Sequence, residues 1–275
     1  MRRCDYHSHT PLCLHAEGEP EAFVAQAISL GLSQYGIADH APIRMTSPDE
    51  RYDDWRMLES QLPDYFAWVQ RAKIAAGDKL QILTALECDW LEGCEPWIAD
   101  LAASGRYDYL IGSMHYVLAD KAVDEPSAET NCPTGSVQSD WDLYWAGMTK
   151  LVQSKLFDIV GHCDLVKIWA RYPEGDLMRY YKPFLAALRA HPTVVELNVA
   201  GWHKPCAEQY PACPLLEALM AQGTPICINS DAHLPEQVSR DWQRGLELLQ
   251  DIAGGKLQQG IYTTQFGAQL TVFTA

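Results

Sequence analysis

The chain has 275 residues, of which 48% are hydrophobic and 21% are charged, and it contains 9 Trp and 13 Tyr. This composition can build a sizeable core and excludes a disordered or low-complexity chain. Asp and Glu number 36 against 21 Lys and Arg, and the resulting net charge of −15 argues against partners such as nucleic acid or anionic lipid.

Short apolar segments alternate with longer helical segments along the chain. Seven of the short segments are typical of buried strands, because each is bounded by Gly, Pro, Asp or Asn. These predicted strands cover residues 3–9, 34–39, 80–87, 107–115, 157–164, 193–199 and 225–231. Buried strands joined by helical crossovers predict an α/β fold with a mostly parallel sheet, open or closed.

Helices are predicted between the strands, and proline and glycine mark several of their ends. Pro20 begins one helix that stops at Gly31, and Pro63 should kink or split the next one. Residues 119–139 are rich in turn-forming residues and predict a long loop over one face. The predicted helices cover residues 20–30, 49–76, 141–156, 176–190, 214–222 and 236–253.

The chain is expected to form one domain over residues 1–275, since a single barrel commonly reaches this size. No run of 18 apolar residues occurs, and no apolar segment follows the positive charges near the N-terminus. The nine Cys residues include no C-x-x-C pair and are interpreted as reduced thiols. These features together predict a cytoplasmic protein without a membrane span.

Candidate metal ligands gather at the ends of the predicted strands. Six of the seven strands end in such a residue. In a β/α barrel these strand ends converge on one face, so distant residues would surround a single cavity. The candidates are His7, His9, Asp39, His40, Glu87, His115, His162, Asp164, Asp231 and His233, and His15 follows shortly after the first strand.

Each candidate also has an ordinary explanation when it is taken alone. An isolated H-x-H pair such as His7 and His9 is more often part of a polar core or surface. Glu87 could be a surface carboxylate, and His115 could be a hydrogen-bonded core histidine. Chance is a poor explanation for potential metal ligands at six of seven strand ends, so we interpret the set as a metal site.

The type of ligand indicates the type of site. Imidazole and carboxylate groups without paired thiols favour an open catalytic site over a structural zinc site. The number of ligands suits two or three divalent ions, with carboxylates bridging between them. Closely spaced cations activate water and stabilise an anionic transition state, which suits hydrolysis of a phosphate ester. Zn, Mn and Fe would all accept such ligands.

Several motifs resemble the polymerase-and-histidinol-phosphatase (PHP) superfamily in order and spacing. They are H-x-H at His7 and His9, His15, D-H at 39–40, Glu87, G-S-x-H at 112–115, G-H-x-D at 161–164 and S-D-A-H at 230–233. Residues 157–165 and 196–198, together with Gly201, Lys204, Pro205, Tyr210 and Pro211, are more narrowly similar to the monofunctional histidinol-phosphate phosphatases.

The resemblance implies a distorted seven-stranded (β/α)7 TIM-like barrel with a trinuclear metal site. A hydroxide bridging two ions would attack phosphorus, with Glu87, Asp231 and His233 as the expected catalytic residues. Asp5, Asp39 and Asp164 would orient imidazoles or serve as caps and turns. The implied sets are His7, His9, Glu87 and Asp231 for one ion, Glu87, His115 and His162 for the second, and His15, His40 and His233 for the third.

One loop departs from the family pattern. Related phosphatases usually carry a basic Gly-Leu-Arg-Lys run after the sixth strand, whereas this chain has Gly-Trp-His-Lys at residues 201–204. An arginine expected to face the substrate phosphate is therefore missing. The predicted substrate-binding residues are His203 and Lys204 in this loop and Lys167 and Arg171 after the fifth strand.

The resemblance thus predicts a metal-dependent phosphomonoesterase that hydrolyses L-histidinol phosphate in histidine biosynthesis. Its partner would be a small phosphorylated substrate, without nucleic acid or membrane. One alternative is a PHP phosphoesterase for another small phosphate ester or a nucleotide. A second alternative is a metal-binding protein without catalysis.

Overall fold

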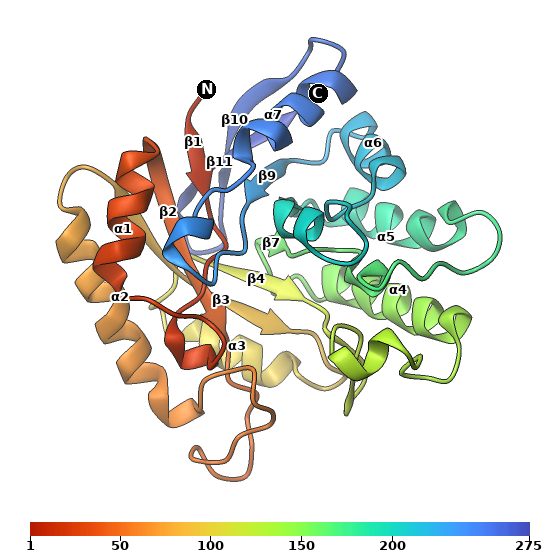
Figure 1. The fold of residues 1–275 in the computed structure, drawn as a ribbon, viewed down its shortest axis with the longest axis horizontal. Coiled ribbons are helices and arrows are strands. Elements are labelled where there is room, and N and C mark those ends of the chain that lie inside the picture. Colours follow the sequence, from red (N-terminus) through yellow and green to blue (C-terminus); the bar gives the residue numbers. More distant parts are fainter.

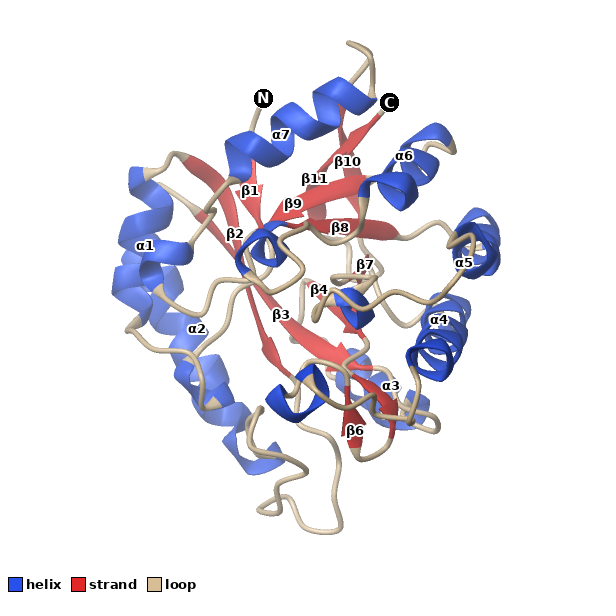
Figure 2. Ribbon diagram, turned by 45° about the vertical axis from the view of Figure 1, so that its right-hand side comes forward, coloured by secondary structure: helices blue, strands red, loops and turns tan.

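A computed structural model describes residues 1–275 and shows one curved sheet of nine strands with helices packed outside it (Figures 1 and 2). The strand order is β1-β2-β3-β4-β7-β8-β9-β11-β10. The strands are β1 (Arg3–Asp5), β2 (Leu32–His40), β3 (Gln81–Asp89), β4 (Tyr109–Ser113), β7 (Ile159–Val160), β8 (Val194–Asn198), β9 (Ile226–Asn229), β10 (Gln258–Thr263) and β11 (Gln269–Thr274). Strands β1 to β9 in this order pair in parallel, which confirms the predicted parallel α/β sheet.

The sheet differs from the predicted seven-stranded barrel at its C-terminal end. Two further strands, β11 and β10, add to β9 in antiparallel orientation. Beside β9, the chain following β1 forms only an isolated parallel bridge between Ser8 and Ala232. Neither of these strands was predicted, and β10 is mostly exposed, so it lacks the apolar signature by which the seven strands were predicted.

The interior of the curved sheet forms a small core of its own. It contains 12 buried residues from eight of the nine strands or their immediate ends, whereas 59 buried residues form the main core. At its centre Tyr109 Oη donates a hydrogen bond of 2.5 Å to the carbonyl of Tyr6. Position 36 must be glycine, because a Cβ there would lie 1.8 Å from Tyr109 Oη. Close packing of this kind keeps the strand ends at fixed positions.

Seven α-helices accompany the sheet and pack their apolar faces on it. Helix α1 begins with Pro20 as predicted. Ser136 caps α4 by accepting a hydrogen bond from the Ser139 amide. The helices are α1 (Pro20–Ser29), α2 (Leu62–Ala76), α3 (Glu95–Ala103), α4 (Val137–Ser154), α5 (Met178–Ala190), α6 (Cys213–Ala221) and α7 (Trp242–Ile252).

Several predicted boundaries are wrong, and α3 was not predicted. The helix predicted over residues 49–76 begins only at Leu62, with Pro63 in its first turn, where proline costs no hydrogen bond. Helix α7 begins at Trp242 rather than at residue 236, because residues 235–237 form a separate 3-10 turn. Residues 49–61 and 236–241 therefore lie outside these helices, and both segments contribute residues to the wall of the cavity described below.

The predicted loop over residues 119–139 is more ordered than expected. Strand β6 (Lys121–Ala122) pairs with β5 (Tyr116–Leu118) in a small separate sheet, and a 3-10 turn covers Pro126–Glu129. Helix α4 already begins at Val137, within the predicted loop. None of the helices has the length and apolar character that crossing a membrane requires.

Candidate metal centre

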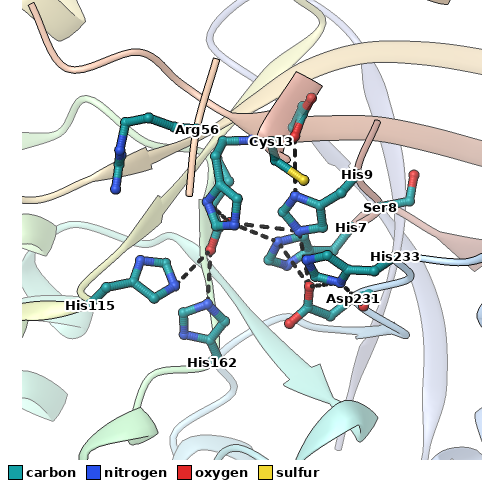
Figure 3. A network of polar contacts seen from close by, with 12 residues as sticks. His7, Ser8, His9, Cys13, Arg56, His115, His162, Asp231 and His233 are labelled. Atoms are coloured by element: carbon teal, nitrogen blue, oxygen red, sulfur yellow. Dashed lines mark hydrogen bonds and ion pairs between the residues drawn. The ribbon is translucent and has the colours of Figure 1, made fainter. Parts of the chain in front are cut away.

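The expected ligands come together at the C-terminal ends of the parallel strands (Figure 3). His40 ends β2 and Glu87 lies within β3. The others lie in the segments that follow the strands, where loops can direct side chains into a common space. These are His7 and His9 after β1, His15 after a 3-10 turn, His115 after β4, His162 after β7, and Asp231 and His233 after β9.

Three groups of these residues could each hold an ion, because their ligand atoms lie within 4.8 Å of one another. Glu87 belongs to two of the groups. Its Oε1 lies 2.8 Å from His162 Nε2, and its Oε2 lies 2.9 Å from His40 Nδ1. The groups are His7, His9 and Glu87; Glu87, His115 and His162; and His15, His40 and His233.

Asp231 stands beside the first group and has a backbone conformation that is unusual for aspartate. Its Oδ1 lies 3.0 Å from His9 Nε2 and 3.8 Å from His7 Nε2. Its φ is 53°, a left-handed conformation that costs a non-glycine residue energy and that persists only when the surroundings enforce it. The strained turn directs the carboxylate toward the same space as His7 and His9.

Protein acceptors fix the orientation of most of the imidazoles. His7 Nδ1 donates to Glu196 at 2.8 Å, and His115 Nδ1 donates to Asp89 at 2.7 Å. The Nδ1 atoms of His15 and His233 contact backbone carbonyls at 2.9 and 3.0 Å. Because each acceptor occupies Nδ1, the Nε2 atom is left free to bind a cation.

Burial and neighbouring charges lower the pKa of some of these imidazoles and raise the pKa of others. Burial lowers the pKa of His40 to about 4 and the pKa of His233 well below its usual value. Burial acts in the same direction on His9 and His115, but neighbouring carboxylates outweigh it. Contacts with Asp231 and Asp39 raise the pKa of His9 to about 9, and Asp89 and Glu87 raise that of His115 to about 10.

The donor set fits divalent cations. The buried atoms His7 Nε2 and Glu87 Oε2 have no hydrogen-bond partner in the protein, which is costly unless another group satisfies them. His15 Nε2 and His233 Nε2 face each other at 3.0 Å, although two lone pairs would repel. Cations bound in the respective groups would satisfy these atoms.

Metal binding to the ion-free protein should release protons near neutral pH. His9 and His115, with pKa values of about 9 and about 10, carry a proton at pH 7 that must leave before Nε2 can bind an ion. Zinc affinity should therefore rise as the pH increases from 6 to 9. Proton release measured with a pH indicator during zinc titration checks this, and a pH-independent affinity without proton release would contradict it.

Two residues that hold the ligands were not predicted as orienting groups. Glu196 is fully buried in β8, where it accepts from His7 Nδ1, from the His162 amide at 3.0 Å and from Asn229 at 2.8 Å. Asp89 lies two residues after Glu87 in β3 and therefore on the same face of the strand. Of the three predicted orienting residues, Asp39 contacts a ligand imidazole, His9. Asp5 and Asp164 bind other groups.

Replacing Glu196 by Gln should weaken metal binding, because an amide is a weaker acceptor for the His7 imidazole. Loss of an orienting carboxylate typically costs about 10- to 100-fold in metal affinity. Competition with a zinc chelator measures the change, with exposed Glu217→Gln as the matched control. Equal affinity of Glu196→Gln and the native protein would show that Glu196 does not support the site.

Seven of the nine expected metal ligands line a cavity of about 540 Å³, whereas His7 and His9 are fully buried and do not line it. Trp55 and Tyr116 add aromatic surface, and Arg56 lies in the wall with its guanidinium paired to Asp53 and Asp89 at 2.8 Å. His203 and Lys204 from the loop after β8 also line this cavity. His203 Nε2 lies 2.6 Å from Asp241, so this imidazole already has a partner.

Lys167 and Arg171 do not line the cavity, contrary to the expectation for substrate-binding residues. Lys167 is fully buried, and its ammonium binds Asp164 at 3.0 Å, Glu208 at 2.8 Å and the carbonyl of Gln209 at 2.7 Å. Three acceptors use the three donors of the ammonium. Arg171 binds the carbonyl of Ala128 and the thiol of Cys132.

The PHP domain model matches residues 5–200 of the chain. The chain belongs to the PHP family. The match contains the elements that carry seven of the nine expected metal ligands, and the remaining two, Asp231 and His233, follow β9.

The PHP chain is also similar to individual relatives along nearly its whole length. A Deinococcus radiodurans protein named a probable histidinol-phosphatase is 32% identical over 252 residues, which cover 91% of this chain and 94% of that protein. The hisK structure from Listeria monocytogenes has a TM-score of 0.78 at 25% identity and covers 88% of this chain and 99% of that one.

A structure of histidinol phosphate phosphatase from Lactococcus lactis shares the fold. Its TM-score is 0.72 at 23% identity, and the match covers 91% of this chain and 94% of that one. That structure is a complex with zinc, L-histidinol and phosphate.

Proposed function

We propose that this PHP protein is a metal-dependent phosphomonoesterase that hydrolyses L-histidinol phosphate to L-histidinol and phosphate. The observation that carries the proposal is the set of three adjoining groups of metal-binding side chains, each of which contributes at least one residue to the wall of a single cavity. The names of the Deinococcus and Lactococcus relatives support the choice of substrate. All nine thiols are free, which agrees with a cytoplasmic site of action. We also infer that residues 1–275 form a single functional domain.

The protein residues would hold two or three divalent ions, of which Zn, Mn and Fe suit the donors. When bound, such ions supply Lewis acidity and lower the pKa of water toward neutrality. Glu87 keeps two groups of ligands at a fixed separation through its two oxygens. The nearby histidines His7, His40 and His115 outweigh the effect of burial and hold the pKa of Glu87 well below its usual value, which favours the anionic form of this ligand.

The cavity wall carries side chains of both charges, which suits a substrate with a phosphate at one end and an amine at the other. Lys204 and Arg240 provide cations, whereas Asp124 and Glu125 provide carboxylates. Trp55 can cover an imidazole ring by stacking. L-histidinol phosphate has a dianionic phosphate, an ammonium group and an imidazole, and so offers a group of matching chemistry to the cations, the carboxylates and Trp55.

The test is a comparison of kcat/KM values for a panel of phosphate esters with the zinc-, manganese- and iron-loaded protein. L-histidinol phosphate should give the highest value among amino-alcohol phosphates, sugar phosphates, nucleotides and short single-stranded DNA. A clear preference for a nucleotide or sugar phosphate would make the protein a different PHP phosphoesterase. Absence of hydrolysis with full metal occupancy would make it a metal-binding protein without catalysis.

A further inference from the structure

Arg240 is a cavity-lining arginine without a charged partner. It lies between the 3-10 turn after His233 and helix α7. Its Nε is buried without a hydrogen-bond partner, and its only side-chain hydrogen bond is a long one, 3.5 Å from Nη2 to the Ser230 carbonyl. No carboxylate lies within 4.0 Å of its guanidinium. A buried donor without a partner in a ligand cavity indicates a ligand acceptor.

The other cations near the cavity are differently placed. The guanidinium of Arg56 is neutralised by Asp53 and Asp89, each at 2.8 Å. His203 is held by Asp241 at 2.6 Å. Lys204 has no ion pair within 4.0 Å, but it is largely exposed. Arg240 is therefore the one cavity-lining guanidinium that keeps an uncompensated charge, and a guanidinium can form the two parallel hydrogen bonds that match a phosphate.

The backbone around Arg240 is held in an unfavourable conformation. Ser239 and Asp241, on either side of it, have φ values of 54° and 50°, which non-glycine residues rarely adopt. The Ser239 amide donates to Asp5 at 2.8 Å, and Arg3 donates to the Ser239 hydroxyl and carbonyl at 2.8 and 2.7 Å. Such enforced strain is typical of positions that present a functional side chain.

The path of the chain places Arg240 close to the metal ligands. The Ser230 carbonyl that Nη2 contacts precedes Asp231, and both Asp231 and His233 share the cavity wall with Arg240. A phosphate that binds among the metal ligands could thus also reach the guanidinium edge that carries Nε.

We propose that Arg240 binds the phosphate group of the substrate, with its Nε and Nη donors directed at phosphate oxygens that the metal ions leave free. This proposal rests on the proposed phosphatase function and adds a residue to its phosphate subsite. The role is to bind phosphate rather than the amine end of the substrate. It therefore predicts different effects on the two products.

The test compares inhibition by the two products in Arg240→Gln, with Arg244→Gln as the matched control. Arg244 lies on α7 four residues further along, over the Trp202 ring and outside the cavity. Arg240→Gln should raise the inhibition constant of inorganic phosphate and the KM of L-histidinol phosphate by roughly 10- to 100-fold, as expected for loss of charge-assisted hydrogen bonds. The inhibition constant of L-histidinol should stay within twofold, and metal content should be unchanged.

Arg240→Lys should recover part of the phosphate affinity, since lysine keeps the positive charge but cannot form the two parallel hydrogen bonds of a guanidinium. A phosphate inhibition constant within twofold of the native value in Arg240→Gln, or equal weakening of phosphate and histidinol, would overturn the proposal. If the native protein prefers another phosphomonoester, the same comparison with that substrate and inorganic phosphate still tests Arg240. A failure of the histidinol phosphate assignment is thereby distinguished from a failure of the arginine assignment.

Discussion

Replacing Glu87 by Gln is expected to abolish turnover while the fold is retained. Both carboxylate oxygens are used, with Oε1 facing His162 at 2.8 Å and Oε2 facing His40 at 2.9 Å and His7 at 3.3 Å. An amide has one oxygen and no charge, so it cannot join two ion sites. The value of kcat should fall by at least about 10²- to 10³-fold, the loss seen when one electrostatic stabiliser of a transition state is removed.

The fold should survive because Glu87→Gln conserves volume and because the histidines that face Glu87 can become neutral by losing a proton when the carboxylate is gone. Steady-state kinetics, metal analysis and circular dichroism on the same preparation separate the effects. Exposed Glu217→Gln should behave like the native protein. Near-native turnover of Glu87→Gln with full metal occupancy would show that Glu87 does not join the sites.

Replacing Lys167 by Met is expected to destabilise the protein strongly, although Lys167 was predicted to contact substrate. The ammonium is fully buried between Asp164 and Glu208, and both carboxylates outweigh burial to raise the pKa of Lys167. Removing one partner of a buried ion pair leaves an uncompensated charge, which typically costs about 3–5 kcal/mol. Urea denaturation should therefore show a decrease of this size in the free energy of unfolding.

Lys150→Met provides the control, because Lys150 is exposed and its nearest carboxylate, on Glu92, lies 3.8 Å away. Such surface pairs contribute at most about 1 kcal/mol. At a temperature where Lys167→Met is still folded, its KM for substrate should remain close to the native value. A large rise in KM without loss of stability would instead support the original expectation of substrate contact.

The positions of the strands and the candidate ligands could be predicted because they follow from local patterns. Apolar runs end in ionisable residues, and in parallel β/α folds the ends of such runs meet. Glu87 and His115 precede His233 by 146 and 118 residues, yet their positions at strand ends placed all three on one face. The division of the ligands into three sets came from the family resemblance, not from spacing.

Side-chain environments could not be predicted in the same way. The sequence shows that Lys167 follows Asp164 by three residues, but it does not show that Glu208 and Gln209 fold over it. Glu196 was noted only as part of a motif, because its contact with His7 joins strands far apart in the chain. Strands β10 and β11 were both missed. Strand β10 is mostly exposed and is polar apart from Ile261 and Tyr262, and its pairing with β11 supplies the stability that its own composition lacks.

The most direct test of the account is a metal titration of the chelator-treated protein with L-histidinol phosphate as substrate. Phosphate release and bound metal are measured together at each metal-to-protein ratio. The account predicts no turnover without metal and full turnover once two or three divalent ions are bound per chain. Turnover that persists in the metal-free protein, or absence of turnover at every metal content, would contradict it.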